Sequence, residues 1–189
     1  IQVDYVKLKS NGEVDINHLV ELLSEDIPTL VSLMHVNNEI GTVLDIEKVG
    51  RLCKQHKALF HSDTVQSVGK TEIDLQNIDV DFIVASAHKF HGPKGTGFAF
   101  IRKNSGLQPL LFGGEQEKGL RAGTESIHNI AGMAKALELS YENLEAERKP
   151  ILELKKYFIE QLQSNFSEFK INGNSDGFYN IINVLFPFS

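Results

Sequence analysis

A lysine near the middle of this 189-residue sequence has a setting that is unusual for a surface residue. Lys89 follows the apolar run 80–85, which is typical of a buried strand, and precedes a Gly/Pro turn at 92–95. Most loop lysines are ordinary charged groups. A lysine held in a partly desolvated site can instead be neutral and nucleophilic, as a Schiff-base lysine requires. Lys94, within the turn, is the alternative nucleophile, although such a lysine is more often solvated.

Other polar side chains are expected near Lys89. Three polar clusters directly follow predicted strands: residues 37–42, 62–66 and 86–89. The carboxyl ends of parallel strands meet at one edge of a sheet, and ligands of such sheets bind there. We therefore expect the three clusters to form one site.

Helices and strands alternate along the first half of the chain, which predicts βαβ units. Asp15 and Asp45 are expected to cap helices at 16–23 and 46–56. Strands are predicted at 2–8, 29–36, 58–61, 80–86 and 97–102, and the continuous apolar run 29–36 is a candidate central strand. The predicted fold class is α/β, with a mostly parallel sheet and flanking helices.

The second half of the chain has a different pattern. After a glycine-rich stretch, Thr124 is expected to cap a helix at 125–148, and Pro150 suits the first turn of another helix that ends near residue 166. The inward face of the first helix would comprise Ile127, Ile130, Ala131, Ala134 and Leu137. Strands are then predicted at 169–171 and 179–186. This change predicts a large domain at 1–145 and the start of a small α+β domain at 146–189.

Composition excludes several function classes. The net charge is −6 and no basic run occurs, so we expect no nucleic-acid partner. No apolar run approaches membrane-spanning length, so we expect no membrane association and a cytoplasmic protein. The single cysteine, Cys53, excludes a disulfide framework and is expected to be inert packing on a helix. Both ends interrupt strand-like patterns, so we expect a fragment of a longer protein.

The pairing of Asp63 with Lys89 suggests a specific cofactor. The two residues end different predicted strands, 26 positions apart, at the same edge of the sheet. Pyridoxal phosphate (PLP) needs an amine that binds its aldehyde and a carboxylate that keeps its pyridine nitrogen protonated. Gln66 and Asn38 could contact the ring oxygen, and Asn38 could alternatively bind a substrate carboxylate. Phosphate contacts could come from Ser86, His88 and Thr124.

Four motifs carry a resemblance to a known family. Residues 33–41, 61–70, 86–95 and 121–124 resemble the motifs of cysteine desulfurases, which are PLP enzymes of fold type I in the class V aminotransferase group. The resemblance implies that Lys89 is the Schiff-base lysine and Asp63 the partner of the pyridine nitrogen. It further implies that Gln66 and Asn38 contact the ring oxygen and the substrate, and that Ser86 and His88 bind the phosphate.

The same resemblance implies the reaction and the partners. L-cysteine would be converted to L-alanine, and the sulfur would pass through an enzyme persulfide to an acceptor such as an iron–sulfur scaffold protein. Thr124 would reach the phosphate of a neighbouring subunit, which implies a homodimer. The family's persulfide cysteine, its substrate-binding arginine and the histidine that stacks on the ring have no counterpart here, so we expect this segment alone to be inactive.

Three alternatives remain open. A metal site could be built from Asp63 with the histidines of the three clusters, namely His35, His61, His88 and His91. It would leave Lys89 and Gln66 without a role, and each histidine could simply be a hydrogen-bonded residue at a strand end. Another class V enzyme, a selenocysteine lyase or an aminotransferase, would share the same PLP-binding residues. A non-catalytic scaffold is the third alternative.

Overall fold

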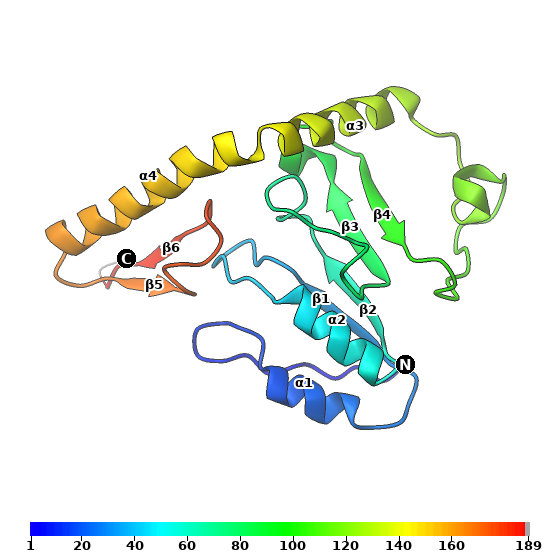
Figure 1. Ribbon diagram of the computed structural model, residues 1–189, viewed down its shortest axis with the longest axis horizontal. Coiled ribbons are helices and arrows are strands. Elements are labelled where there is room, and N and C mark those ends of the chain that lie inside the picture. The colour runs from blue at the N-terminus through cyan, green and yellow to red at the C-terminus, as the bar shows by residue number, and fades with distance from the viewer. Residues whose placement is uncertain (188–189) are drawn as a thin grey trace.

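The computed structural model describes residues 1–187 and is organised around a four-stranded sheet (Figure 1). The strands lie in the order β1 (Leu30–Met34), β2 (Leu59–Asp63), β3 (Phe82–Ser86) and β4 (Gly97–Ile101). The β1–β2 and β2–β3 pairs are parallel, whereas β3 and β4 are antiparallel. The mostly parallel sheet with flanking helices confirms the predicted fold class.

One capped helix precedes β1, and a second capped helix connects β1 to β2. The α1 helix (Ile16–Leu23) begins after Asp15, whose carboxylate accepts hydrogen bonds from the amides of Asn17 and His18. The α2 helix (Ile46–Gln55) begins after Asp45, which accepts from the amide of Lys48. Both helices have the predicted cap, and their apolar residues recur with helical spacing on the side that faces the hydrophobic core.

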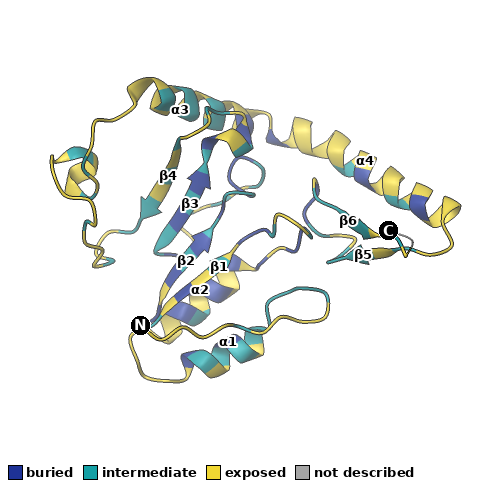
Figure 2. Cartoon of the chain, turned by 180° about the vertical axis from the view of Figure 1, so that it is seen from behind, coloured by how far each residue is buried: buried dark blue, intermediate teal, exposed yellow. Residues whose placement is uncertain are grey.

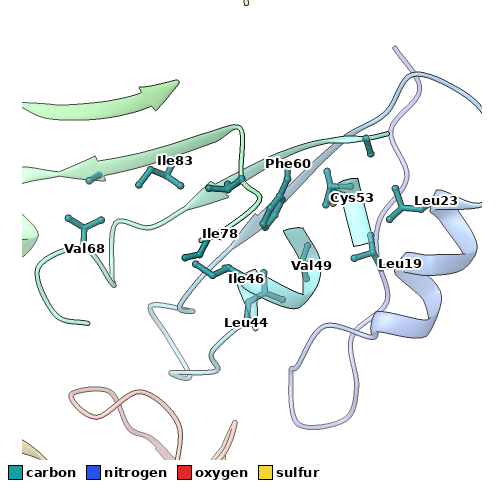
Figure 3. Close-up of a cluster of buried hydrophobic side chains, with 14 of the residues drawn as sticks. Leu19, Leu23, Leu44, Ile46, Val49, Cys53, Phe60, Val68, Ile78 and Ile83 are labelled. Atoms are coloured by element: carbon teal, nitrogen blue, oxygen red, sulfur yellow. The ribbon is translucent and has the colours of Figure 1, made fainter. Parts of the chain in front are cut away.

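The sheet has two unlike faces. Strand alternation and register place the side chains of Val31, Leu33, Phe60, Ser62, Ile83 and Ala85 on one face, which we call the covered face. There they join residues of α1 and α2 in the main core, including Leu19, Val49 and Cys53 (Figure 3). The opposite face, which we call the open face, carries Ser32, Met34, His61, Asp63, Val84 and Ser86.

A long exposed segment and two helices follow β4. The segment contains the short 3-10 helix η2 (Gln116–Gly119) and leads to α3 (Ile127–Glu142) and α4 (Leu144–Asn165). Most of α4 is exposed, as its yellow colour in Figure 2 shows. The inner side of α3 is formed by Met133, Ala136 and Leu137, which pack against the main core. The predicted inward face was therefore mostly wrong: Leu137 packs inward, but Ile127, Ile130, Ala131 and Ala134 are exposed.

The chain ends in a small antiparallel pair of strands, β5 (Lys170–Asn172) and β6 (Asn183–Leu185). Figures 1 and 2 show this pair below α4 and beside the loop that follows β1. A second, smaller core joins Val36, which follows β1, to Phe178 and Tyr179 of the tail. The tail therefore packs against the part of the chain that follows β1.

Four local predictions were wrong. Residues 2–7 form no strand, and Leu8 makes only an isolated bridge with Val14. Within the described residues β1 lies at an edge of the sheet rather than at its centre. The first long helix begins at Ile127 rather than after Thr124, and no side chain caps it. It ends at Glu142, and Pro150 lies inside α4 because the preceding residues 144–149 are good helix formers that start this helix earlier.

Among residues 1–187, no helix combines the length and apolar character needed to cross a bilayer.

Candidate active site

The carboxyl ends of β1, β2 and β3 form the edge of the sheet that carries the polar clusters, and we call this edge the rim. Since the three strands are parallel, the segments that follow them leave the sheet on the same side. Register places Met34 of β1 beside Asp63 of β2, and Asp63 beside Val84 of β3. The structure thus brings the three predicted clusters to one edge.

Asp63 is the last residue of β2 and lies on the open face, half-buried. Its Oδ1 atom accepts a hydrogen bond of 2.9 Å from the amide of Val65, which fixes the carboxylate at the start of the following turn. Its backbone carbonyl accepts from the amide of His35 at 2.9 Å. One carboxylate oxygen is therefore held by the backbone, and the other can receive a proton donor at the rim.

Lys89 lies in the 3-10 helix η1 (Ala87–Phe90), which follows β3 directly. Ala87 and Phe90 are buried in the main core and anchor this turn, whereas Lys89 is half-buried and His88 is exposed. His91 has a left-handed backbone (φ 67°) that ends η1, and the amide of Gly92 returns to the carbonyl of Ala87 at 2.8 Å. A side chain at Gly92 would lie 2.9 Å from the Cβ of Ala87, so this tight return requires glycine.

Three of the four rim histidines are bonded to serine hydroxyls. Nδ1 of His61 lies 2.8 Å from the Oγ of Ser32 on the neighbouring strand. Nδ1 of His88 lies 2.9 Å from the Oγ of Ser86, the residue that ends β3. These pairs show what holds the imidazole rings, and they place the hydroxyl and imidazole of residues 86 and 88 next to each other.

The third pair, His35 and Ser67, is buried. The Oγ of Ser67 donates to the carbonyl of Thr64 at 3.1 Å, so it accepts from Nδ1 of His35 at 2.9 Å, and this arrangement places the imidazole proton on Nδ1. Burial lowers the pKa of His35 from 6.5 to about 4, so this histidine is neutral at physiological pH. The bond links the end of β1 to the turn that carries Gln66.

Gln66 is oriented by a second lysine. Lys70 donates from Nζ to Oε1 of Gln66 at 3.4 Å, which leaves the amide donor of Gln66 free to point elsewhere. Burial lowers the pKa of Lys70, and the nearby ammonium group of Lys89 lowers it further. The charges of Lys70 and Lys89 therefore repel each other. Sequence reasoning did not single out Lys70 or Ser67, although both belong to the 61–70 motif.

Asn38 and Thr124 are the two predicted site residues outside this group. Asn38 lies in the loop after β1, where its exposed amide donates to Oε1 of Glu39 at 2.7 Å. Thr124 is exposed and lies in the segment between β4 and α3, which extends away from the strands in Figure 1. The structure brings Asn38 to the rim through its strand and gives Thr124 a separate location.

Cys53 does not belong to the site. It is almost fully buried on the covered side of the sheet, in α2. Burial raises the pKa of its thiol to about 12, with a further contribution from Asp81. Within the described residues, no three His, Cys, Asp or Glu side chains gather closely enough to hold a metal ion.

Comparison with known proteins identifies the family. The sequence model of the family described as "Aminotransferase class-V" matches residues 1–187, so the chain belongs to the class-V aminotransferases. The chain is 39% identical over 188 residues to the cysteine desulfurase IscS of Dictyoglomus turgidum, covering 99% of this chain and 48% of that protein. It is 37% identical over 190 residues to the mitosomal cysteine desulfurase of Encephalitozoon cuniculi, covering 44% of that protein.

Solved structures give the same family. A structure described as a NifS-like protein matches with a TM-score of 0.92 and 38% identity, over 100% of this chain and 52% of that one. A structure of SspA in complex with cysteine matches with a TM-score of 0.79 and 32% identity, over 97% of this chain and 50% of that one. The chain therefore spans about half the length of the relatives it matches, and its fold is that of the PLP enzymes of fold type I.

Class-V aminotransferases and cysteine desulfurases are PLP enzymes, and the groups at the rim fit this cofactor. A carboxylate with one free oxygen, an amine on the adjacent strand end, and a hydroxyl–imidazole pair match the ring nitrogen, the aldehyde and the phosphate. His35 is neutral, so the pair of His35 and Ser67 adds no positive charge near the groups that would bind the cofactor.

Proposed function

We propose that the full-length protein is a PLP-dependent cysteine desulfurase, which converts L-cysteine to L-alanine and passes the sulfur on as an enzyme persulfide. The membership in the class-V family and the relatives named cysteine desulfurase support this proposal. The observation that carries it is the placement of Asp63 and Lys89 at the ends of the adjacent parallel strands β2 and β3.

Each rim residue has a role in this proposal. Lys89 binds the aldehyde of PLP through its amine and, once released from it, can move a proton at the substrate. Asp63 holds a proton at the pyridine nitrogen with its free carboxylate oxygen. Gln66 donates to the ring oxygen from the amide that Lys70 leaves free, and Asn38 contacts the same oxygen or the substrate carboxylate. Ser86 and His88 bind the phosphate.

PLP supplies an electron sink that weakens the bonds at the substrate carbon bearing the amino group. The chain's own residues set how well that sink works. If the Asp63 carboxylate did not stabilise the protonated ring nitrogen, the ring would accept electrons less readily. Lys89 is half-buried, which excludes part of the water from its amine. Burial and then the charge of Lys89 lower the pKa of the neighbouring Lys70.

The partners in this proposal are a second copy of the chain and a sulfur acceptor. Thr124 lies in an exposed segment away from the rim, which suits a contact with the phosphate of a neighbouring subunit in a homodimer. Because Cys53 is buried, the persulfide cysteine belongs to another part of the full-length protein. The acceptor would be a protein such as an iron–sulfur scaffold, and the location would be the cytoplasm.

We also propose the division of the chain into a partial PLP-binding domain at 1–145 and the start of a small domain at 146–189. The division falls in the first turn of α4, just after the break at Asn143 between the two long helices. The main core lies within residues 1–145, whereas the smaller core is formed by tail residues and a single residue of the large domain, Val36.

The proposal is tested with the full-length protein loaded with PLP. We expect alanine and persulfide sulfur in equal amounts from L-cysteine, and loss of both with Lys89→Ala. Lys94→Ala serves as the matched control and should retain activity. A protein that transfers amino groups to a keto acid, or that acts on selenocysteine and not on cysteine, would instead identify another class-V enzyme.

A further inference from the structure

The loop after β1, residues 37–42, carries Asn38 and is held from two sides. Within the loop, the amide of Gly41 donates to the carbonyl of Asn37 at 3.0 Å, and Oδ1 of Asn37 accepts from the amides of Glu39 and Ile40 at 2.9 and 3.0 Å. These bonds fold the loop onto itself. Two other carbonyl groups of the loop, those of Glu39 and Gly41, accept hydrogen bonds from the tail of the chain.

Two tail residues bind these carbonyls. The amide of Phe178 donates to the carbonyl of Gly41 at 2.7 Å, and Nδ2 of Asn183 donates to the carbonyl of Glu39 at 3.2 Å. Apolar contact supports the bonds, because Phe178 and Ile181 belong to the small core that contains Val36. The loop that presents Asn38 is thus joined to residues about 140 positions further along the chain.

The approach of the two backbones is close. A side chain at Gly177 would lie 2.7 Å from the carbonyl oxygen of Gly41, and a side chain at Gly173 would lie 2.5 Å from that of Ile40. Glycine at both positions allows the tail to contact the loop backbone directly.

A buried lysine holds the tail side of this contact. Lys155 of α4 is only 8% exposed, and its Nζ donates to the carbonyls of Gly177 and Phe178 at 3.0 and 2.9 Å. The carbonyl of Gly177 and the amide of Phe178 belong to one peptide group. That peptide therefore accepts from a cation on one side and donates to Gly41 on the other, an arrangement in which the two hydrogen bonds strengthen each other.

We propose that Lys155, Gly177 and Phe178 form a latch that positions the loop 37–42, and through it the side chain of Asn38, at the rim. The latch makes Lys155 a positioning residue that acts through Asn38 without touching cofactor or substrate. The link to catalysis rests on the function proposed above, whereas the link to the loop rests only on the contacts described here.

The first test uses Lys155→Met in the full-length protein, which keeps most of the apolar part of the side chain and removes the ammonium group. We expect amide hydrogen exchange in peptides spanning 37–42 and 177–183 to become roughly tenfold faster, because a charge-assisted bond to a buried carbonyl is lost. Lys156→Met is the matched control, since Lys156 is exposed on the same helix. Equal exchange in the two variants would overturn the latch.

A second variant covers the possibility that Lys155→Met fails to fold. Asn183→Asp removes the donor to the carbonyl of Glu39 and places a carboxylate against it. Asn180→Asp adds the same charge at an exposed position of the same segment. We expect faster exchange of the loop in Asn183→Asp alone, and unchanged exchange in both variants would overturn the proposal.

The final test asks whether the latch acts through Asn38. The Kd for PLP and the KM for L-cysteine are measured in Lys155→Met, Asn38→Ala and the double variant. We expect Lys155→Met to raise one of these constants several-fold in the wild-type background and to add nothing in Asn38→Ala. Additive effects would overturn action through Asn38. A wild-type protein that binds no PLP would overturn the proposed function instead, and the exchange measurements would still decide whether the latch exists.

Discussion

The covered and open faces of the β1–β4 sheet differ in what their side chains do. Covered-face residues such as Phe60 and Ile83 are almost fully buried among α1 and α2, whereas open-face residues such as Ser32 and Met34 are exposed. Asp63 and Ser86, two of the proposed cofactor contacts, lie on the open face. Because neighbouring residues of one strand point to opposite faces, a shift of one position moves a side chain from a structural role to a chemical one.

The largest expected effect on the covered face comes from Phe60→Ala. Phe60 has no exposed surface, so truncation leaves a cavity, and the free energy of unfolding should fall by ~3–5 kcal/mol. His61→Ala, one position along β2 on the open face, should cost less than ~1 kcal/mol. Urea denaturation of the full-length protein, followed by circular dichroism, gives both values. Equal losses would contradict the division into two faces.

Acid should destabilise the protein through His35, the buried histidine that directly follows β1. The pKa of His35 is lowered by burial from 6.5 to about 4, so between these values the unfolded chain takes up a proton that the folded chain does not. Stability is therefore lost as the pH falls from 6.5 towards 4, by about 3 kcal/mol at most. Denaturant unfolding at several pH values across this range gives the free energy of unfolding. We expect it to fall more steeply with decreasing pH in the wild type than in His35→Gln. Parallel curves would show that His35 is not buried in its neutral form.

Asp63→Ala should separate chemistry from stability. The variant should still bind PLP covalently, because Lys89 is intact, but turnover of L-cysteine should fall on the order of a hundredfold without the carboxylate at the ring nitrogen. Its free energy of unfolding should change little, since Asp63 is only half-buried. Turnover and denaturation are measured on the same preparation. Near-normal turnover would remove Asp63 from the proposed site.

The smallest expected effect comes from removing a hydroxyl group that is buried on the covered face. The Oγ of Ser62 is fully buried on the covered face and has no hydrogen-bond partner among residues 1–187. Ser62→Ala removes this hydroxyl, so stability should stay within ~1 kcal/mol of the wild type or rise slightly. Thermal unfolding compared with Ser32→Ala on the open face checks this. A clear loss in Ser62→Ala would mean that the hydroxyl has a partner in the full-length protein.

Much of the α/β part could be predicted from the sequence because local signals determine it. Asp15 and Asp45 mark the starts of α1 and α2, and apolar runs mark three parallel strands whose ends must share one edge. The position of β1 at the edge of the sheet that residues 1–187 form could not be predicted, since strand order depends on pairing between distant segments. Pro150 was misleading because helix-forming residues before it outweigh its local preference.

The polar contacts of the site were less predictable. The pairs of Ser32 with His61 and of His35 with Ser67 join residues 29 and 32 positions apart, so they depend on strand register rather than on local pattern. The bonds of Lys155 to the tail depend on how α4 packs over residues 177–178. Motif resemblance indicated which segments form the site, and the three-dimensional structure was needed to show what orients each side chain.

The account depends most directly on Lys89 as the amine that carries PLP. Borohydride reduction of the PLP-loaded full-length protein, followed by peptide mapping, traps the covalent link as a pyridoxyl-lysine. We predict a single label on Lys89. A label on Lys94 or Lys70, with Lys89 unmodified, would contradict the proposed site.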